Sequence, residues 1–237
     1  MKIKAYNSKK EVAIAFSNYL AEAIASKDKI HIALSGGSTP KIVFDELAQN
    51  FQEIDWAKVH LYWGDERCVP PSDDESNYKM TDLHLLSKIN IPKENVHRIK
   101  GENDPLEEAK QYAKLLKEKL PFKNDIPQFD VVILGMGDDG HTASIFPHEI
   151  ALWNSTSYCE LATHPTSGQK RVSITGQVIN NAQTVTFLAT GANKADKFKE
   201  ITTKSGAYLS YPASLVVPTS KNLIWFVDNA AAEITSN

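Results

Sequence analysis

FDVVILGMGDDGH, residues 129–141, is an apolar run followed by a glycine-rich turn that ends in a histidine. The apolar part, 129–134, is typical of a strand that is buried on both faces of a parallel sheet. In sheets of this kind, ligands bind outside the carboxyl ends of the strands. The stretch therefore predicts a parallel α/β fold, and it also predicts the end of the sheet at which a site lies.

The segments on either side of this stretch alternate between short apolar strands and helices. Strands are expected at 30–34, 59–63, 184–189 and 223–227, and helices at 11–26, 41–50, 76–87, 106–120 and 194–203. This alternation predicts an α/β fold in three layers, with a mostly parallel central sheet covered by helices on both faces. A length of 237 residues without a repeat or an obvious linker favours a single domain spanning 1–237.

Composition excludes several classes of function. The net charge is −3 and Lys and Arg form no long run, so we expect no nucleic acid and no membrane as a partner. No apolar run approaches membrane length, the N-terminus lacks the apolar core of a signal peptide, and the two cysteines, Cys68 and Cys159, are too few for a disulfide framework. We therefore expect a cytoplasmic protein, as a monomer or a weak homodimer, that acts on a small molecule.

The glycines of the turn match a known spacing but not its usual ligand. Gly135, Gly137 and Gly140 satisfy the G-x-G-x-x-G pattern of a dinucleotide-binding loop. A pyrophosphate in this loop would meet two carboxylates, Asp138 and Asp139, so the charges argue against a dinucleotide. The glycines instead predict a sharp turn that presents side chains at the end of the strand.

His141 is the side chain of the turn that is best suited to move protons near neutral pH. Asp139 is expected to orient the imidazole or to fix its tautomer, which makes His141 a candidate general base. A metal site drawing on Asp65, Asp139, His141 and His148 is the competing interpretation, but the spacing matches no strong metal signature. No G-x-S-x-G elbow is present, which argues against a serine nucleophile.

The segment 35–40, SGGSTP, joins a predicted strand to a predicted helix. Its two glycines let the backbone approach a ligand, and the N–H groups of the first helical turn attract anions. Gly36, Gly37, Ser38 and Thr39 are therefore candidate phosphate-binding residues. A capped tight turn is the alternative interpretation.

Three cations stand near predicted strand ends. Arg67 in GDER (64–67) can bind phosphate as a fork donor, although a surface ion pair is the alternative. Arg171 precedes a short β-like run. Lys194 lies at a predicted helix start, where a cation opposes the helix dipole unless an anion neutralises it; a solvated lysine is the alternative.

Together these motifs resemble the 6-phosphogluconolactonase family, within the larger group that includes the glucosamine-6-phosphate deaminases. The matching stretches follow the family's order: LSGGSTP (34–40), WGDERCVP (63–70) with DESN (74–77), FDVVILGMGDDGHTASIFP (129–147), RVSITG (171–176) and GANKA (191–195). They span most of the chain. Each motif alone is only suggestive, whereas the ordered set is specific.

The resemblance implies a Rossmann-like domain that hydrolyses 6-phospho-D-glucono-1,5-lactone to 6-phospho-D-gluconate, the second step of the oxidative pentose phosphate pathway. It implies no metal and no organic cofactor. The implied catalytic residues are His141 as general base, Asp139 and Asp65, and the implied phosphate-binding residues are Gly36, Gly37, Ser38, Thr39, Arg67, Arg171 and Lys194.

Two other functions stay open beside the lactonase. The deaminases are similar in the glycine loop and the Asp-Gly-His turn, but they typically carry Asp-Glu-Tyr where residues 65–67 read DER. They also typically continue with Ile-Ala-Phe-Asn-Glu-Pro, whereas residues 142–147 read TASIFP and lack that functional Glu. A non-enzymatic sugar-phosphate sensor would need the phosphate-binding groups without the base.

Overall fold

The computed structural model describes residues 1–233, and its centre is a seven-stranded parallel sheet. The strand order is β1 (Lys2–Tyr6), β12 (Leu223–Asp228), β11 (Thr184–Ala189), β8 (Val131–Gly135), β2 (Ile30–Leu34), β3 (Val59–Trp63) and β5 (Val96–His97). The chain proceeds from β2 outward to β3 and β5, and then from β8 outward to β11 and β12. The switch point therefore lies between β2 and β8, where α/β sheets bind their ligands.

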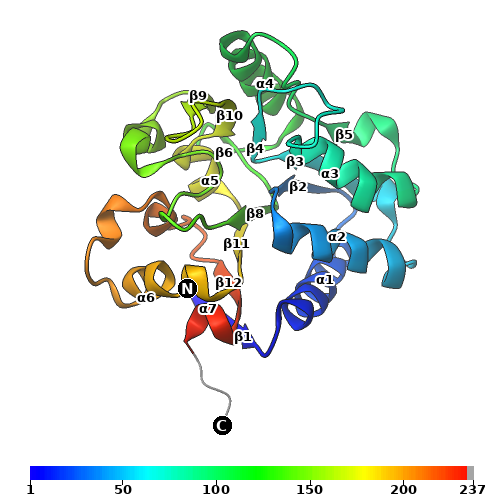
Figure 1. Ribbon diagram of the computed structural model, residues 1–237. Helices are drawn as coiled ribbons and strands as arrows, with labels where there is room; N and C mark the ends of the chain where they lie inside the picture. Colours follow the sequence, from blue (N-terminus) through cyan, green and yellow to red (C-terminus); the bar gives the residue numbers. More distant parts are fainter. Residues whose placement is uncertain (234–237) are drawn as a thin grey trace.

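Helices cover both faces of this sheet, as predicted (Figure 1). One face carries α1 (Lys9–Ala25), α2 (Ser38–Asn50) and α3 (Asn77–His84), and the other carries α5 (Gly176–Asn181), α6 (Ala195–Thr203) and α7 (Asn229–Ala232). The residues of β2 are all buried, which explains why the central strands are mostly apolar. Within residues 1–233, each helix is too short or too polar to cross a membrane.

A smaller antiparallel sheet lies beyond the carboxyl end of β3. It consists of β4 (Asp65–Arg67), β10 (Lys170–Ile174) and β9 (Cys159–Thr163), and α4 (Pro105–Lys119) packs beside it. The chain enters β4 directly from β3, through Gly64, whose carbonyl accepts from the Ile174 backbone N–H at 2.9 Å. A two-stranded hairpin, β6 (Phe122–Lys123) and β7 (Ile126–Pro127), completes the strands.

The predicted three-layer α/β fold with a parallel sheet is confirmed, and the differences concern the periphery. The pattern of residues did not predict β1, because this edge strand is mostly exposed and its lysines alternate with apolar residues. The helix expected at 41–50 begins at Ser38, with Pro40 inside its first turn, where the missing N–H costs little. The helix expected at 76–87 spans Asn77–His84, and Ser76 caps it, its hydroxyl accepting from the Lys79 backbone N–H at 3.1 Å.

Three imidazoles lie side by side across β2, β3 and β5. His31 stacks on His60 with ring centroids 5.0 Å apart, and His60 stacks on His97 at 5.6 Å. The hydroxyl of Tyr62 lies 3.2 Å from Nδ1 of His31. Burial, followed by the charge of His60, lowers the pKa of His31 and that of His97 to about 4. Both rings are therefore neutral in the folded protein at neutral pH.

We predict that the free energy of unfolding decreases as the pH falls from about 6.5 to about 4. An unfolded histidine has a pKa near 6.5, so within this window the unfolded chain binds protons that folded His31 and His97 do not. Linkage gives a loss of about 2 kcal/mol for each of the two rings between pH 7 and pH 5. His97→Phe, which keeps a ring against Tyr62, should reduce this loss. Urea unfolding at the two pH values measures it, and an unchanged pH dependence in the variant would refute the assignment.

Candidate active site

A cleft of about 230 Å³ lies at the carboxyl ends of β2 and β8, at the switch point of the sheet. Its lining combines four loops with the small antiparallel sheet. The lining residues are Ser35, Gly36, Gly37, Asp65, Arg67, Asn77, Gly135, Met136, Gly137, His141, Ala143, Arg171 and Lys194. The structure thus brings together segments 35–37, 65–67 and 135–143 and Lys194, which follow separate strands of the parallel sheet. Three of the predicted site residues, Asp139, Ser38 and Thr39, are not among the lining residues.

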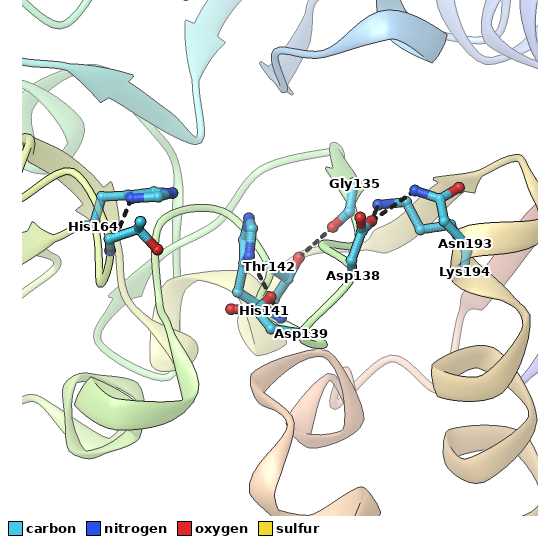
Figure 2. A network of polar contacts seen from close by, with 9 residues as sticks. Gly135, Asp138, Asp139, His141, Thr142, His164, Asn193 and Lys194 are labelled. Carbon is cyan, nitrogen blue, oxygen red and sulfur yellow. Dashed lines mark hydrogen bonds and ion pairs between the residues drawn. The ribbon is translucent and has the colours of Figure 1, made fainter.

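The Asp-Gly-His turn holds an imidazole against a carboxylate (Figure 2). Nδ1 of His141 lies 2.6 Å from Oδ1 of Asp139, and the same oxygen accepts from the His141 backbone N–H at 3.0 Å. The Gly137 N–H closes the turn by donating to the His141 carbonyl at 2.9 Å. A Cβ on Gly137 would lie 2.1 Å from Nδ1 of His141, and Gly140 has a φ of +83°. The glycine spacing is therefore what allows the two side chains to meet.

The contact with His141 keeps Asp139 ionised. Burial alone would raise the pKa of this carboxyl, but the hydrogen bond and the charge of His141 outweigh it and lower the pKa to about 2. An ionised carboxylate can only accept hydrogen bonds, so Nδ1 carries the proton of the neutral imidazole and Nε2 keeps its lone pair. The pair has the arrangement of a general base oriented by a second group.

Arg67 and Arg171 occupy directly opposite positions on β4 and β10. Like charges in such positions destabilise a sheet, so an anion bound between the two would relieve their repulsion. Both Nε atoms are buried, and within residues 1–233 neither has a hydrogen-bond partner. The Arg171 guanidinium lies 5.6 Å from the centroid of the Phe146 ring, and burial lowers its pKa. Two guanidinium groups with unused donors at a cleft form a binding site for a phosphate or a carboxylate.

Lys194 reaches the cleft from the segment in front of α6. Its ammonium pairs with Oδ1 of Asp138, which also accepts from Nδ2 of Asn193 at 2.8 Å (Figure 2). Hydrogen bonding to Lys194 lowers the pKa of the Asp138 carboxyl despite its partial burial. Asp138 is thus the anion that compensates a cation at this helix start. A bound phosphate would share Lys194 with it.

Gly36 and Gly37 bring backbone to the cleft at the start of α2. A Cβ on Gly36 would lie 1.9 Å from Oδ1 of Asn77, so the loop and α3 pack here at a distance that only glycine allows. Gly37 has a φ of +109° and is the N-cap of α2, without a side chain to satisfy the first N–H groups of the helix. These groups are suited to an anion.

The hydroxyls of Ser38 and Thr39 bond to neighbouring elements. Ser38 Oγ accepts from Nζ of Lys9 at 2.7 Å, and Thr39 Oγ1 lies 2.7 Å from the Thr190 hydroxyl. Of this predicted group, the glycines therefore line the cleft, while the two hydroxyls bond to the segments that surround α2.

The residues of the DER motif (65–67) have different positions, two at the cleft and one against the start of α3. Asp65 is buried at the cleft, and its Oδ2 accepts from the Ser144 hydroxyl at 2.6 Å. Glu66 instead accepts from the backbone N–H groups of Asn77 and Tyr78, each at 2.8 Å. Burial raises the pKa of Glu66, and these N–H groups oppose the rise. Asp65 and Arg67 thus line the cleft, while Glu66 holds the start of α3.

Asn77, Ala143 and Phe146 help to form the site, although the sequence did not predict them. The Phe146 ring packs 4.7 Å from the His141 ring, centroid to centroid. Ala143 has a φ of +47°, which is uncommon for a residue with a Cβ. The motifs DESN and DGHTASIFP contain these residues, but no single side chain type marked them. Their roles depend on tertiary contacts.

The alternative metal ligands do not form one group. Within residues 1–233, no cluster of three or more His, Cys, Asp or Glu side chains is arranged to hold a metal ion. His148, a member of the suggested set, lies with its Nε2 3.9 Å from a carboxylate oxygen of Glu149. The cleft therefore combines an oriented base with a cationic end. Such a site is suited to proton transfer on a small anionic substrate.

Comparison with known proteins agrees with this chemistry. The family described as glucosamine-6-phosphate isomerases/6-phosphogluconolactonase matches residues 5–225. The 6-phosphogluconolactonase of Haemophilus influenzae is 45% identical over 207 residues, which cover 86% of this chain and 87% of that protein. The structure of 6-phosphogluconolactonase from Trypanosoma brucei has a TM-score of 0.89 at 29% identity and covers 99% of this chain and 98% of that one. A monomeric glucosamine-6-phosphate deaminase shares the fold, with a TM-score of 0.82 at 18% identity over 99% of this chain and 100% of that one.

Proposed function

The chain belongs to the glucosamine-6-phosphate isomerase/6-phosphogluconolactonase family, and we propose that it hydrolyses 6-phospho-D-glucono-1,5-lactone to 6-phospho-D-gluconate. This reaction is the second step of the oxidative pentose phosphate pathway. The observation that carries the proposal is one cleft in which the His141–Asp139 pair stands near two opposed arginines. The pair supplies a base, and the arginines supply a site for the phosphate.

His141 acts as the general base in this proposal. Its Nε2 takes a proton from a water molecule while the water oxygen forms a bond to C1 of the lactone. The carbonyl electrons move to an oxyanion, which backbone N–H groups of the cleft loops stabilise. When the intermediate collapses, the bond between C1 and the ring oxygen breaks, and the ring oxygen takes the proton from the imidazolium. Asp139 stabilises the transient positive charge on His141.

The phosphate binds at the cationic end of the cleft. Arg67 and Arg171 have unused donors, and Lys194 and the N–H groups near Gly37 extend the same positive region. Binding the remote phosphate positions C1 beside the base, and a lactone is already reactive, so positioning contributes much of the acceleration. Asp65, held by Ser144, is assigned to orienting the sugar.

The deciding experiment follows acid release from freshly prepared 6-phosphogluconolactone with and without the protein. We expect release well above the spontaneous rate. Binding of the lactone or of 6-phosphogluconate without accelerated release would instead support the sugar-phosphate sensor. Ammonia release from glucosamine 6-phosphate would support the deaminase, the function against which the absent glutamate in TASIFP argues.

A further inference from the structure

His164 lies near the site but takes no part in the mechanism above. It is the first residue after β9, and its backbone N–H donates to the Gln169 carbonyl at 2.9 Å, which closes the loop to β10. The backbone N–H groups of Thr166 and Ser167 both donate to its Nδ1, at 3.3 and 3.2 Å. The ring is therefore held by its own loop, and not by chance packing on the surface.

These two contacts decide the tautomer of His164. A nitrogen that accepts from two backbone N–H groups cannot carry a proton, so the neutral ring has its proton on Nε2. Burial and the positive charge of Arg171 lower the pKa of His164, which keeps the ring neutral at neutral pH. The side chain thus offers one hydrogen-bond donor, at Nε2, on the side away from the loop contacts.

The donor is held beside the reacting groups through Phe146. The His164 ring meets the Phe146 ring edge to face with centroids 5.3 Å apart, and the same Phe146 ring contacts His141 and lies under Arg171. Figure 2 shows the His164 ring extending from its loop toward the side on which His141 and Asp139 lie. His164 is not itself a lining residue of the cleft, and its ring lies one aromatic contact away from both His141 and Arg171.

We propose that Nε2–H of His164 donates a hydrogen bond to an oxygen of the sugar part of the substrate and so selects sugar phosphates over smaller phosphate compounds. The inference rests on the proposed function, because it takes the ligand to be a phosphorylated sugar acid or its lactone. A neutral donor suits this position. A further cation beside Arg67, Arg171 and Lys194 would bind any phosphate equally, whereas a neutral N–H recognises a hydroxyl or a carbonyl oxygen.

Two substitutions separate the donor from the loop contact. His164→Asn keeps an acceptor near the place of Nδ1 for the Ser167 N–H, but it has no group at Nε2. His164→Gln places an amide N–H near Nε2 and loses the acceptor near Nδ1. Calorimetry with 6-phosphogluconate and, separately, with inorganic phosphate measures both variants against the unsubstituted protein.

We expect His164→Asn to weaken 6-phosphogluconate binding by about tenfold, as for one lost hydrogen bond, and to leave phosphate binding unchanged. His164→Gln should bind 6-phosphogluconate nearly as the unsubstituted protein does. Normal binding by His164→Asn, an equal loss for both ligands, or an equal loss in both variants would overturn the role of the donor. The proposed function is tested apart from this, by whether the unsubstituted protein accelerates lactone hydrolysis.

Discussion

His141→Asn is expected to lower kcat for 6-phosphogluconolactone by roughly 10²–10⁴, the range for loss of a general base. The asparagine amide can occupy the place of Nδ1 and donate to Asp139, which now accepts from the ring at 2.6 Å. The variant therefore keeps the turn and loses only the lone pair of Nε2. Because the lactone also hydrolyses spontaneously, the rate with the variant must be compared with a blank at the same pH.

Binding provides the control for this substitution. The cations proposed to bind the phosphate lie on other elements, so His141→Asn should bind 6-phosphogluconate within about threefold of the unsubstituted protein, a smaller change than the loss of one hydrogen bond would cause. His148→Gln, a change at an exposed side chain outside the cleft lining, should leave kcat unchanged. Near-normal turnover by His141→Asn would remove His141 from the role of base. Asp65 would then be the first carboxylate of the lining to test.

The contact between Asp139 and His141 could be predicted from sequence because both residues belong to one turn. Asp139 and His141 are two residues apart, and the glycines that allow their contact are adjacent to them. The strand before the turn is apolar throughout since both faces of the sheet are covered. The local sequence pattern therefore predicts the strand, the turn and the order of the side chains on that turn. It also indicates the end of the sheet at which the turn lies.

The cationic end of the cleft could not be derived in this way. The opposition of Arg67 and Arg171 depends on the register of β4 against β10, two short strands far apart in the chain. Neither strand has a distinct apolar pattern, because β4 has three residues and β10 begins with two cations. The ion pair of Lys194 with Asp138 likewise joins two loops. Only the family resemblance groups Arg67, Arg171 and Lys194 as phosphate-binding residues, and it does not predict the contacts that these cations make with other residues.

Ser38 and Thr39 show a second limit of prediction from sequence, which concerns the direction of side chains. A hydroxyl beside a helix start can cap the helix, bind a ligand or bond to a neighbouring segment, and the residue type is the same in each case. In the structure, contacts with Lys9 and Thr190 hold these hydroxyls. The sequence indicated that the glycines of this loop approach the cleft but not the direction of the neighbouring side chains.

Arg171→Met is the second substitution with a large expected effect. The methionine keeps apolar contact with Phe146 and removes the guanidinium, whose Nε is buried and has no partner within residues 1–233. Hydrogen bonds to a charged group contribute about 1.5–3 kcal/mol each, so KM for 6-phosphogluconolactone should rise by roughly 10- to 100-fold. The kcat should change much less, because the His141–Asp139 pair is not altered.

Two further measurements identify the phosphate as the group that Arg171 binds. Unphosphorylated gluconolactone, if it is turned over at all, should be hydrolysed equally well by the variant and by the unsubstituted protein. Inorganic phosphate should raise the Tm of the unsubstituted protein and raise that of Arg171→Met much less, since a ligand that binds only the folded state stabilises it. Lys170→Met, on the preceding residue of β10, which points to the opposite face of the strand, is the matched control and should behave as the unsubstituted protein.

The free protein supplies the last test of this assignment. Arg67 and Arg171 repel each other across the two strands, so Arg171→Met should leave the stability of the ligand-free protein nearly unchanged, although it removes a large, partly buried side chain. A group that served only to hold the small sheet together would behave in the opposite way. Its loss would lower the Tm measured in the absence of phosphate and would change the hydrolysis of both lactones alike. That pattern would assign Arg171 a structural role in the small sheet.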